Sequence, residues 1–117
     1  MPPRSSVSVR IFYPRYSPED IIRTLKEKVP ILLEKLPLRL VVLFGSYARG
    51  NHTVASDVDL LLVYSGEKHP DDYVLARRTL GIPRLELHIY TDAEYQTVKN
   101  TVQRWVEEGI ILCSQEP

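Results

Sequence analysis

The sequence contains a single cysteine, Cys113, among its 117 residues. One thiol cannot form a disulfide within the chain, and a cysteine-ligated zinc site needs further thiols or a matching pair of histidines. Long hydrophobic runs are also missing, since the uninterrupted apolar stretches at 40–44 and 60–64 are short, whereas a membrane-spanning helix needs about 20 residues. We therefore expect no disulfide scaffold, no zinc site of this type and no association with a membrane.

The sequence has no net charge, because 15 Lys and Arg balance 15 Asp and Glu. A protein without a basic excess has no overall field that gathers nucleic acid, so direct nucleic-acid binding is not expected. The N-terminal residues also lack the long apolar stretch of a secretory signal. Together with the single thiol, these features lead us to expect a cytoplasmic protein.

The composition, 44% hydrophobic and 26% charged, is that of an ordinary globular domain, and the length leaves little room for a second one. We expect residues 1–117 to form a single domain with a core at about 18–108. Apolar and polar residues alternate at about 6–13, which predicts an extra N-terminal strand. This strand either extends the sheet or contacts a partner.

Apolar periodicity predicts alternating helices and strands along the core. Ser17 and Pro18 have the residue types of a helix start, and Pro30 should kink or divide the helix that follows. The later elements are expected in this order: strand 38–44, strand 57–64, helix 70–80, strand 84–90 and helix 92–108, the last capped by Asp92. The segment between the second and third strands is long enough for a crossover that makes them parallel.

The segment GSYARGNHTVASDVD, residues 45–59, joins the first two of these strands. Gly45 and Ser46 directly follow one strand, and Asp57 and Asp59 begin the next. Residues two apart on a strand point to the same face, so the two carboxylates lie side by side and repel each other unless a cation binds between them. Magnesium commonly uses one or two carboxylates together with substrate phosphates. The pair therefore predicts a magnesium site that receives phosphate groups.

The turn at Gly45 suits those phosphates. Glycine lets the backbone approach a ligand closely, and a short helix from Ser46 to Arg49 directs amides and a hydroxyl to one point, where Arg49 adds positive charge. Such a site holds a nucleoside triphosphate by its phosphates, while metal ions at Asp57 and Asp59 bind oxygens of the reacting phosphate. The expected reaction is phosphoryl or nucleotidyl transfer.

A third acid, Glu86, lies in the apolar strand at 84–90. If that strand neighbours 57–64, Glu86 shares a face with the aspartates and serves as a metal ligand or as a general base, in a site that holds two metal ions. His88 shares the face of Glu86 and is interpreted as structural. For Tyr47, stacking on a base and packing in the core both stay open.

These residues resemble the signature of the DNA polymerase β-like nucleotidyltransferase superfamily, which combines Gly-Ser, a spacer of about ten residues, Asp-x-Asp and a later third acid. The stretches LFGSYARG, SDVDLLLVY and LELHIYTDAEY are similar to those of its minimal nucleotidyltransferases. The family usually has Asp where this chain has Glu86.

The resemblance implies an α/β fold with a mixed three- to four-stranded sheet, helices mainly on one face and an open acidic groove on the other. It also implies Mg²⁺, with two ions when nucleotide is bound, and ATP as the substrate. The implied acceptor is a hydroxyl, typically of tyrosine, on a HEPN-domain toxin, so the protein would be the antitoxin of a type VII-like toxin–antitoxin pair. The catalytic and metal-binding residues would be Asp57, Asp59 and Glu86, and the phosphate-binding residues Gly45, Ser46 and Arg49.

Two other functions are compatible with the same sequence. A homodimer can complete a pocket for a small molecule, as in an aminoglycoside-modifying nucleotidyltransferase. A hetero-oligomer can instead neutralise a toxin by masking it, without catalysis.

Overall fold

The computed structural model describes residues 17–53 and 56–115. The strand expected at about 6–13 lies outside the described residues. In chain order, the described elements are α1 (Pro18–Leu33), β1 (Leu38–Phe44), α2 (Ser46–Arg49), β2 (Val58–Tyr64), α3 (Asp72–Leu80), β3 (Leu85–Thr91), α4 (Asp92–Glu108) and β4 (Ile110–Ser114). Among the described residues, no helix is long and apolar enough to cross a membrane.

The strands form one mixed sheet in the order β3-β2-β1-β4. β1 is antiparallel to both of its neighbours, and β3 runs parallel to β2 after a crossover through α3. The parallel pairing predicted from the length of that crossover is therefore confirmed, as is the mixed α/β architecture.

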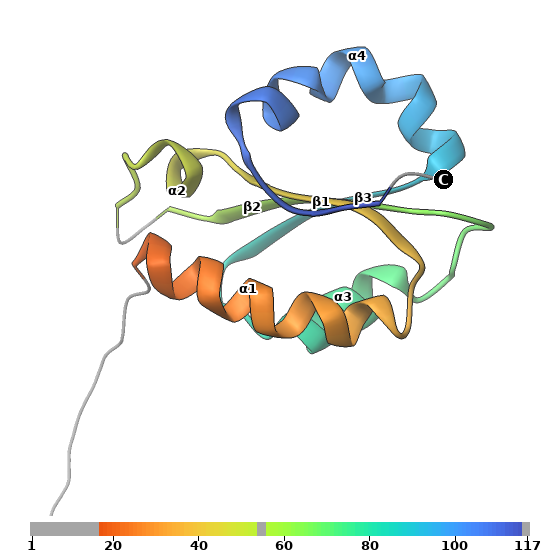
Figure 1. Cartoon of the computed structure of the whole chain (residues 1–117), viewed down its shortest axis with the longest axis horizontal. Coiled ribbons are helices and arrows are strands. Elements are labelled where there is room, and N and C mark those ends of the chain that lie inside the picture. Colours follow the sequence, from red (N-terminus) through yellow and green to blue (C-terminus); the bar gives the residue numbers. More distant parts are fainter. Residues whose placement is uncertain (1–16, 54–55, 116–117) are drawn as a thin grey trace, which may run out of the picture.

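Helices lie against both faces of the sheet (Figure 1). α1 and α3 cover one face over the larger hydrophobic core, which includes Leu25, Leu43 and Leu60. α4 lies against the other face over a smaller core around Val42, Leu61 and Val102. The groove that was expected to be open on this second face is therefore partly covered by α4.

α1 is one continuous helix. Ser17 caps it by accepting from the Asp20 amide, and the Asp20 carboxylate accepts from the Ser17 amide, which completes a capping box. Pro30 lies within the helix and does not divide it. The reason is packing: Val29 and Leu32, on either side of the exposed Pro30, are buried against the sheet and hold the last turn in place.

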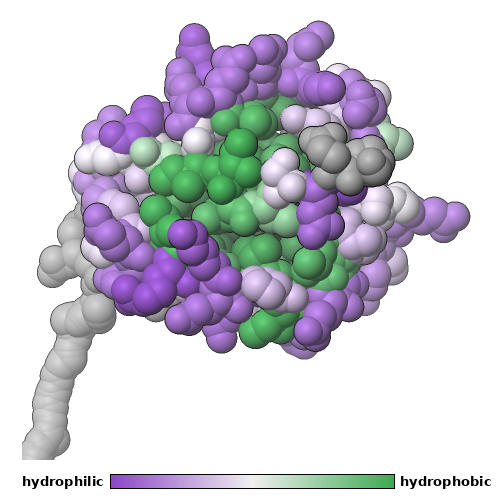
Figure 2. Space-filling model, in the orientation of Figure 1, coloured by the Kyte–Doolittle hydropathy of each residue, from purple (hydrophilic) through white to green (hydrophobic). Residues whose placement is uncertain are grey.

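Two details at the ends of α4 differ from the sequence-based expectation. The cap is Thr91 and not Asp92, because the Thr91 hydroxyl accepts from the Glu94 amide while the Glu94 carboxylate accepts from the Thr91 amide. After Gly109 the chain forms β4, an edge strand that the periodicity did not predict. Figure 2 shows apolar surface between α1 and α4, where β4 runs with Ile111 about half exposed.

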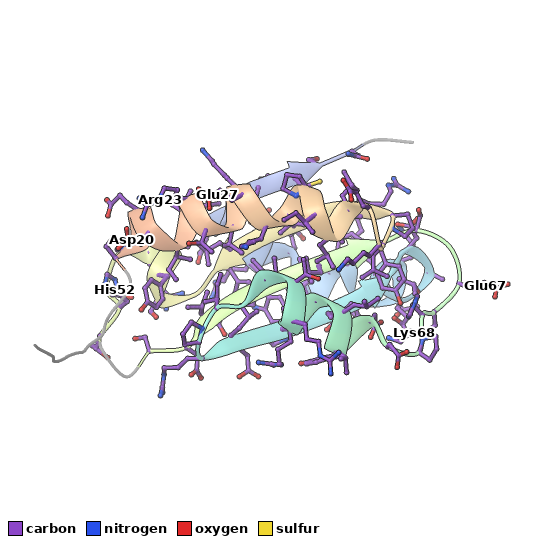
Figure 3. The ribbon with its side chains drawn as sticks, turned by 90° about the horizontal axis from the view of Figure 1, so that it is seen from below. Asp20, Arg23, Glu27, His52, Glu67 and Lys68 are labelled. Carbon is purple, nitrogen blue, oxygen red and sulfur yellow. The ribbon has the colours of Figure 1, made fainter. Side chains whose placement is uncertain are left out.

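The two ends of the sheet carry different loops. Figure 3, seen from the side of α1 and α3, places His52 at the end where α1 begins, close to Asp20 and Arg23. Glu67 and Lys68 lie at the opposite end. His52 belongs to the connection between β1 and β2, so β1 finishes and β2 begins at the same end of the molecule as the start of α1.

Candidate active site

Gly45 joins β1 to α2 in a conformation that few other residues adopt. Its φ is +80° and its ψ is −155°, a region populated almost entirely by glycine. A Cβ at this position would fall on the carboxylate of Asp59. The absence of a side chain at Gly45 therefore lets the Asp59 carboxylate lie directly against the main chain of the turn.

Asp59 lies in the second position of β2 with neighbours on both sides. In the sheet it is opposite Phe44 of β1 and Glu86 of β3. The register therefore places the carboxylates of Asp59 and Glu86 at paired positions on adjacent strands. Partial burial raises the pKa of Asp59, and the nearby His88 lowers it. The negative charges of Asp57 and Glu86 raise this pKa further, and the Arg49 guanidinium lowers it. The Asp59 carboxylate thus lies in a place where added positive charge is favourable.

A cavity of about 290 Å³ opens beside this carboxylate. Asp59, Gly45 and Arg49 line one part of it, which brings together three of the residues predicted from the motif. The remaining lining residues are Phe44 and three residues of α4, namely Arg104, Trp105 and Glu108. The α4 residues were not predicted as site residues, because nothing in their local sequence distinguishes them from the surface and core of an amphipathic helix.

Asp57 and Glu86 lie near Asp59 but outside the lining of the cavity. Asp57 immediately precedes β2 and is exposed, and its Oδ1 is 3.5 Å from Nη2 of Arg84. Glu86 is exposed on β3. Within residues 17–53 and 56–115, no three His, Cys, Asp or Glu side chains are already arranged to hold a metal ion. The carboxylates are close enough to influence one another, but they do not form a closed ligand set.

The donor set nevertheless fits magnesium. All three acids offer oxygen, the ligand that this hard cation prefers, and magnesium usually needs only one or two carboxylates when substrate phosphates and water supply the rest. Burial is the main cause of the raised pKa of Asp59, and the negative charges of Asp57 and Glu86 add to it. A cation bound here would neutralise the repulsion between these carboxylates. Asp59 and Asp57 would hold the ion, with Glu86 on the adjacent strand.

Ser46 begins α2, and the first amides of a helix have no acceptor within it. The Ser46 carbonyl accepts from the amides of Gly50 and Asn51, which closes the turn after α2. Gly45 and Arg49 of this turn line the cavity, whereas Ser46 is not among its lining residues. The phosphate-binding role assigned to Ser46 stays a prediction.

Tyr47 packs in the core. It is buried with the cluster under α1 and α3, and its ring stacks on His52 with centroids 4.5 Å apart. Of the two alternatives left open by the sequence, core packing is therefore the one that the structure shows. The contact also anchors the loop between β1 and β2 to the sheet.

His88 lies among aromatic rings. Its centroid is 5.3 Å from that of Phe44 and 4.9 Å from that of Trp105. These contacts agree with the structural role that the sequence suggested. The sequence did not reveal that the same ring also lies close enough to lower the pKa of Asp59.

Solved structures share this fold. The chain resembles a provisionally named nucleotidyltransferase from Sulfolobus solfataricus, with a TM-score of 0.57, 25% identity and 81% of each chain covered. It also resembles a toxin–antitoxin structure with AMP-PNP, with a TM-score of 0.55, 20% identity and coverage of 78% of this chain and 74% of the other. A third similar structure contains a tri-AMPylated HEPN toxin of Shewanella oneidensis in complex with an MNT antitoxin, with a TM-score of 0.51, 22% identity and coverage of 80% and 73%.

Two relatives come from Methanocaldococcus jannaschii, and their names provisionally assign them as protein adenylyltransferases. One is 33% identical over 98 residues, which cover 77% of this chain and 95% of the relative. The other is 35% identical over 51 residues, so that the match spans 44% of this chain and only about half, 51%, of the relative. Residues 19–112 match the family described as "Nucleotidyltransferase domain". This match includes the Gly45 turn, the aspartates and α4, and the chain belongs to the nucleotidyltransferase domain family.

Proposed function

We propose that this protein is a magnesium-dependent nucleotidyltransferase that transfers AMP from ATP to a tyrosine hydroxyl of a HEPN-domain toxin, and so acts as an antitoxin. The observation that carries the proposal is the half-buried carboxylate of Asp59, which lies against Gly45 in a cavity that Arg49 also lines. The names of the relatives as protein adenylyltransferases support the reaction. The similar fold in complexes of MNT antitoxin with HEPN toxin supports the partner.

The reaction forms one bond and breaks one. The oxygen of the acceptor hydroxyl attacks the α-phosphorus of ATP, the bond from that phosphorus to the oxygen bridging to the β-phosphorus breaks, and pyrophosphate leaves. The hydroxyl proton passes to a carboxylate, for which Glu86 on the adjacent strand is the candidate, or to water. When bound, magnesium supplies positive charge that neutralises the phosphates and the charge that develops on the leaving group.

The residues of this chain position the nucleotide. The glycine turn lets the phosphates come close to the main chain, and Arg49 provides a permanent positive charge on the wall of the same cavity. Asp59 and Asp57 would hold the cation, and Asp59 lines the cavity beside the Gly45 turn where the reacting phosphate would lie. Such positioning and charge neutralisation supply most of the rate in phosphoryl-group chemistry.

Intact mass spectrometry tests the proposal. The chain is incubated with Mg²⁺, ATP and the HEPN-domain protein proposed as its partner, and the mass of that protein is measured. The proposal predicts that the partner gains one or more AMP units with the wild-type chain and none with the Asp57→Asn, Asp59→Asn double variant. An unchanged partner, together with AMP transferred to an aminoglycoside, would point instead to a small-molecule nucleotidyltransferase.

A second candidate is an antitoxin that masks its toxin without catalysis. It is favoured by the ion pair between Asp57 and Arg84 and by the lack, within the described residues, of three acids already arranged around a metal site. Neutralisation of the toxin in cells separates the two candidates. The double Asp→Asn variant should fail to neutralise if AMP transfer is the mechanism, whereas it should protect as well as the wild type if masking suffices.

A further inference from the structure

The cavity beside Asp59 extends to residues that the proposed reaction has not used. Its far wall comes from the last two turns of α4, where Arg104, Trp105 and Glu108 line it. We propose that this α4 wall binds the purine base of the nucleotide, an inference that rests on the proposed function. Arg104 and Glu108 would contact the base edge, and Trp105 would contact its ring.

Two of the residues that line the cavity, Phe44 and Trp105, are aromatic. The rings of Phe44 and Trp105 are stacked with centroids 4.4 Å apart and planes within 6° of parallel, and His88 meets both at an angle. Phe44 is opposite Asp59 in the sheet, so this stack directly adjoins the place assigned to the reacting phosphorus. A nucleobase is flat, and its contact with an aromatic ring is favourable whichever polar groups the base carries.

The rim of the same wall is polar. Nε of Arg104 lies 3.7 Å from Oε2 of Glu108, one helical turn further along, and both side chains are more than half exposed. The pair offers hydrogen-bond donors and acceptors, and the edge of a purine also carries both kinds of group. Apolar walls with a few polar groups at the rim are typical of small-molecule sites.

The arrangement favours the base over the protein acceptor as the occupant. Gly45 and Arg49 take the phosphates at one end and Asp59 lies next to them, which leaves the α4 end for the nucleoside. An acceptor tyrosine, by contrast, arrives on a separate protein and meets the reacting phosphorus from the side opposite the leaving pyrophosphate.

Trp105 is the single tryptophan of the chain, so intrinsic tryptophan fluorescence reports on this wall alone. The full chain is titrated with AMP-PNP and Mg²⁺, and in parallel with inorganic tripolyphosphate and Mg²⁺, which offers phosphates without a base. Calorimetry measures the affinity of each ligand independently. We expect AMP-PNP to change the fluorescence saturably, and tripolyphosphate to bind with little change.

Two variants and a matched control assign the contacts. Trp105→Leu should weaken AMP-PNP binding about 5-fold or more, because a base loses its aromatic contact, while tripolyphosphate affinity stays the same. Glu108→Gln, at an exposed position that tolerates change, should weaken AMP-PNP only. Glu107→Gln is the control, since the adjacent Glu107 pairs with Gln103 and does not line the cavity.

The outcomes separate this inference from the proposed function. Binding of AMP-PNP with unchanged Trp105 fluorescence, or an equal loss of AMP-PNP and tripolyphosphate affinity in Trp105→Leu, overturns the base site and leaves the proposed function standing. Equal losses of AMP-PNP affinity in Glu108→Gln and Glu107→Gln also count against the base site. If the folded wild-type chain binds no AMP-PNP in calorimetry, the proposed function itself is overturned, and the base site with it.

Discussion

The carboxylate of Asp59 occupies the space that a side chain at position 45 would fill. This relationship links two parts of the motif that are far apart in the sequence. The glycine is needed both for its positive φ and for the close approach of the acid to the turn. A substitution at either residue therefore acts on the other.

Gly45→Ala should destabilise the protein by about 1–3 kcal/mol, because alanine is strained in this backbone region and its Cβ meets the Asp59 carboxylate. Gly50→Ala is the matched control. Gly50 also has a positive φ of +81°, but a Cβ there has nothing within 4 Å. Urea unfolding and AMP-PNP calorimetry check both variants. The explanation fails if the two lose the same stability and both keep wild-type nucleotide binding.

Asp59→Asn should reduce AMP transfer by about a hundredfold or more and at the same time raise the melting temperature at neutral pH. The folded-state pKa of Asp59 is raised by burial, so the ionised carboxylate costs stability at pH values above that pKa. The cost disappears as the pH falls below the pKa of the unfolded chain, where the group is protonated in both states. The gain in melting temperature should therefore shrink toward about pH 3.

Calorimetric melts of the wild type and Asp59→Asn from neutral to acid pH test this expectation. Glu67→Gln, at an exposed position, is the control, and its melting temperature should equal that of the wild type at every pH. A variant that melts below the wild type at pH 7 would show that Asp59 stabilises the fold. That result would contradict the cost assigned to its charge.

Glu94→Gln should lower the stability at neutral pH. The hydrogen bond from the Thr91 amide holds the pKa of Glu94 below its ordinary value, and the Lys68 ammonium acts in the same direction. A lowered pKa stabilises the folded state at pH values above the unfolded pKa, and this contribution is lost as the pH falls through the folded pKa. The deficit of the variant should therefore be present in full at about pH 7 and smaller near pH 3, below the ordinary pKa of a glutamate. A deficit that is the same at both values would show that the charge of Glu94 plays no part.

Tyr64→Phe should cost about 1–3 kcal/mol of stability, the typical price of leaving buried polar groups without a hydrogen bond. The Tyr64 hydroxyl donates to Oδ2 of Asp72 at 2.7 Å and accepts from the His69 amide at 2.9 Å. Both Tyr64 and Asp72 are buried. Urea denaturation measures the loss, and AMP-PNP affinity should not change because this network lies at the end of β2 away from Asp59. A loss of nucleotide binding in the folded variant would contradict that separation.

The central strands were predictable because their signals are local. β1 and β2 are short runs of apolar residues with clear ends, and the segment between β2 and β3 is long enough for the crossover that makes β3 parallel to β2. β4 was not predicted, because Ile110, Ile111 and Leu112 are too few to show a period. Their strand conformation depends on pairing with β1, which brings together residues about 70 positions apart.

The site residues also divide into those with a local sequence signal and those that only the tertiary packing brings into place. Gly45, Arg49 and Asp59 carry the motif, and the structure gathers these three around one cavity. Trp105 packs against the smaller core, as expected for an apolar residue of an amphipathic helix, but it also lines the cavity. Arg104 and Glu108 had no local signal at all. Only the packing of α4 across the sheet brings them to the Asp59 carboxylate.

Transfer of label from ATP to the partner is the most direct measurement of the central claim. The chain is incubated with Mg²⁺, the HEPN-domain protein proposed as its partner and ATP labelled either at the α- or at the γ-phosphorus, with Asp59→Asn alongside. Nucleotidyl transfer predicts that only the α label becomes attached to the partner, that the γ label leaves in pyrophosphate, and that Asp59→Asn attaches the α label about a hundredfold less or lower still. Attachment of the γ label, or equal labelling by the wild type and Asp59→Asn, would contradict the account.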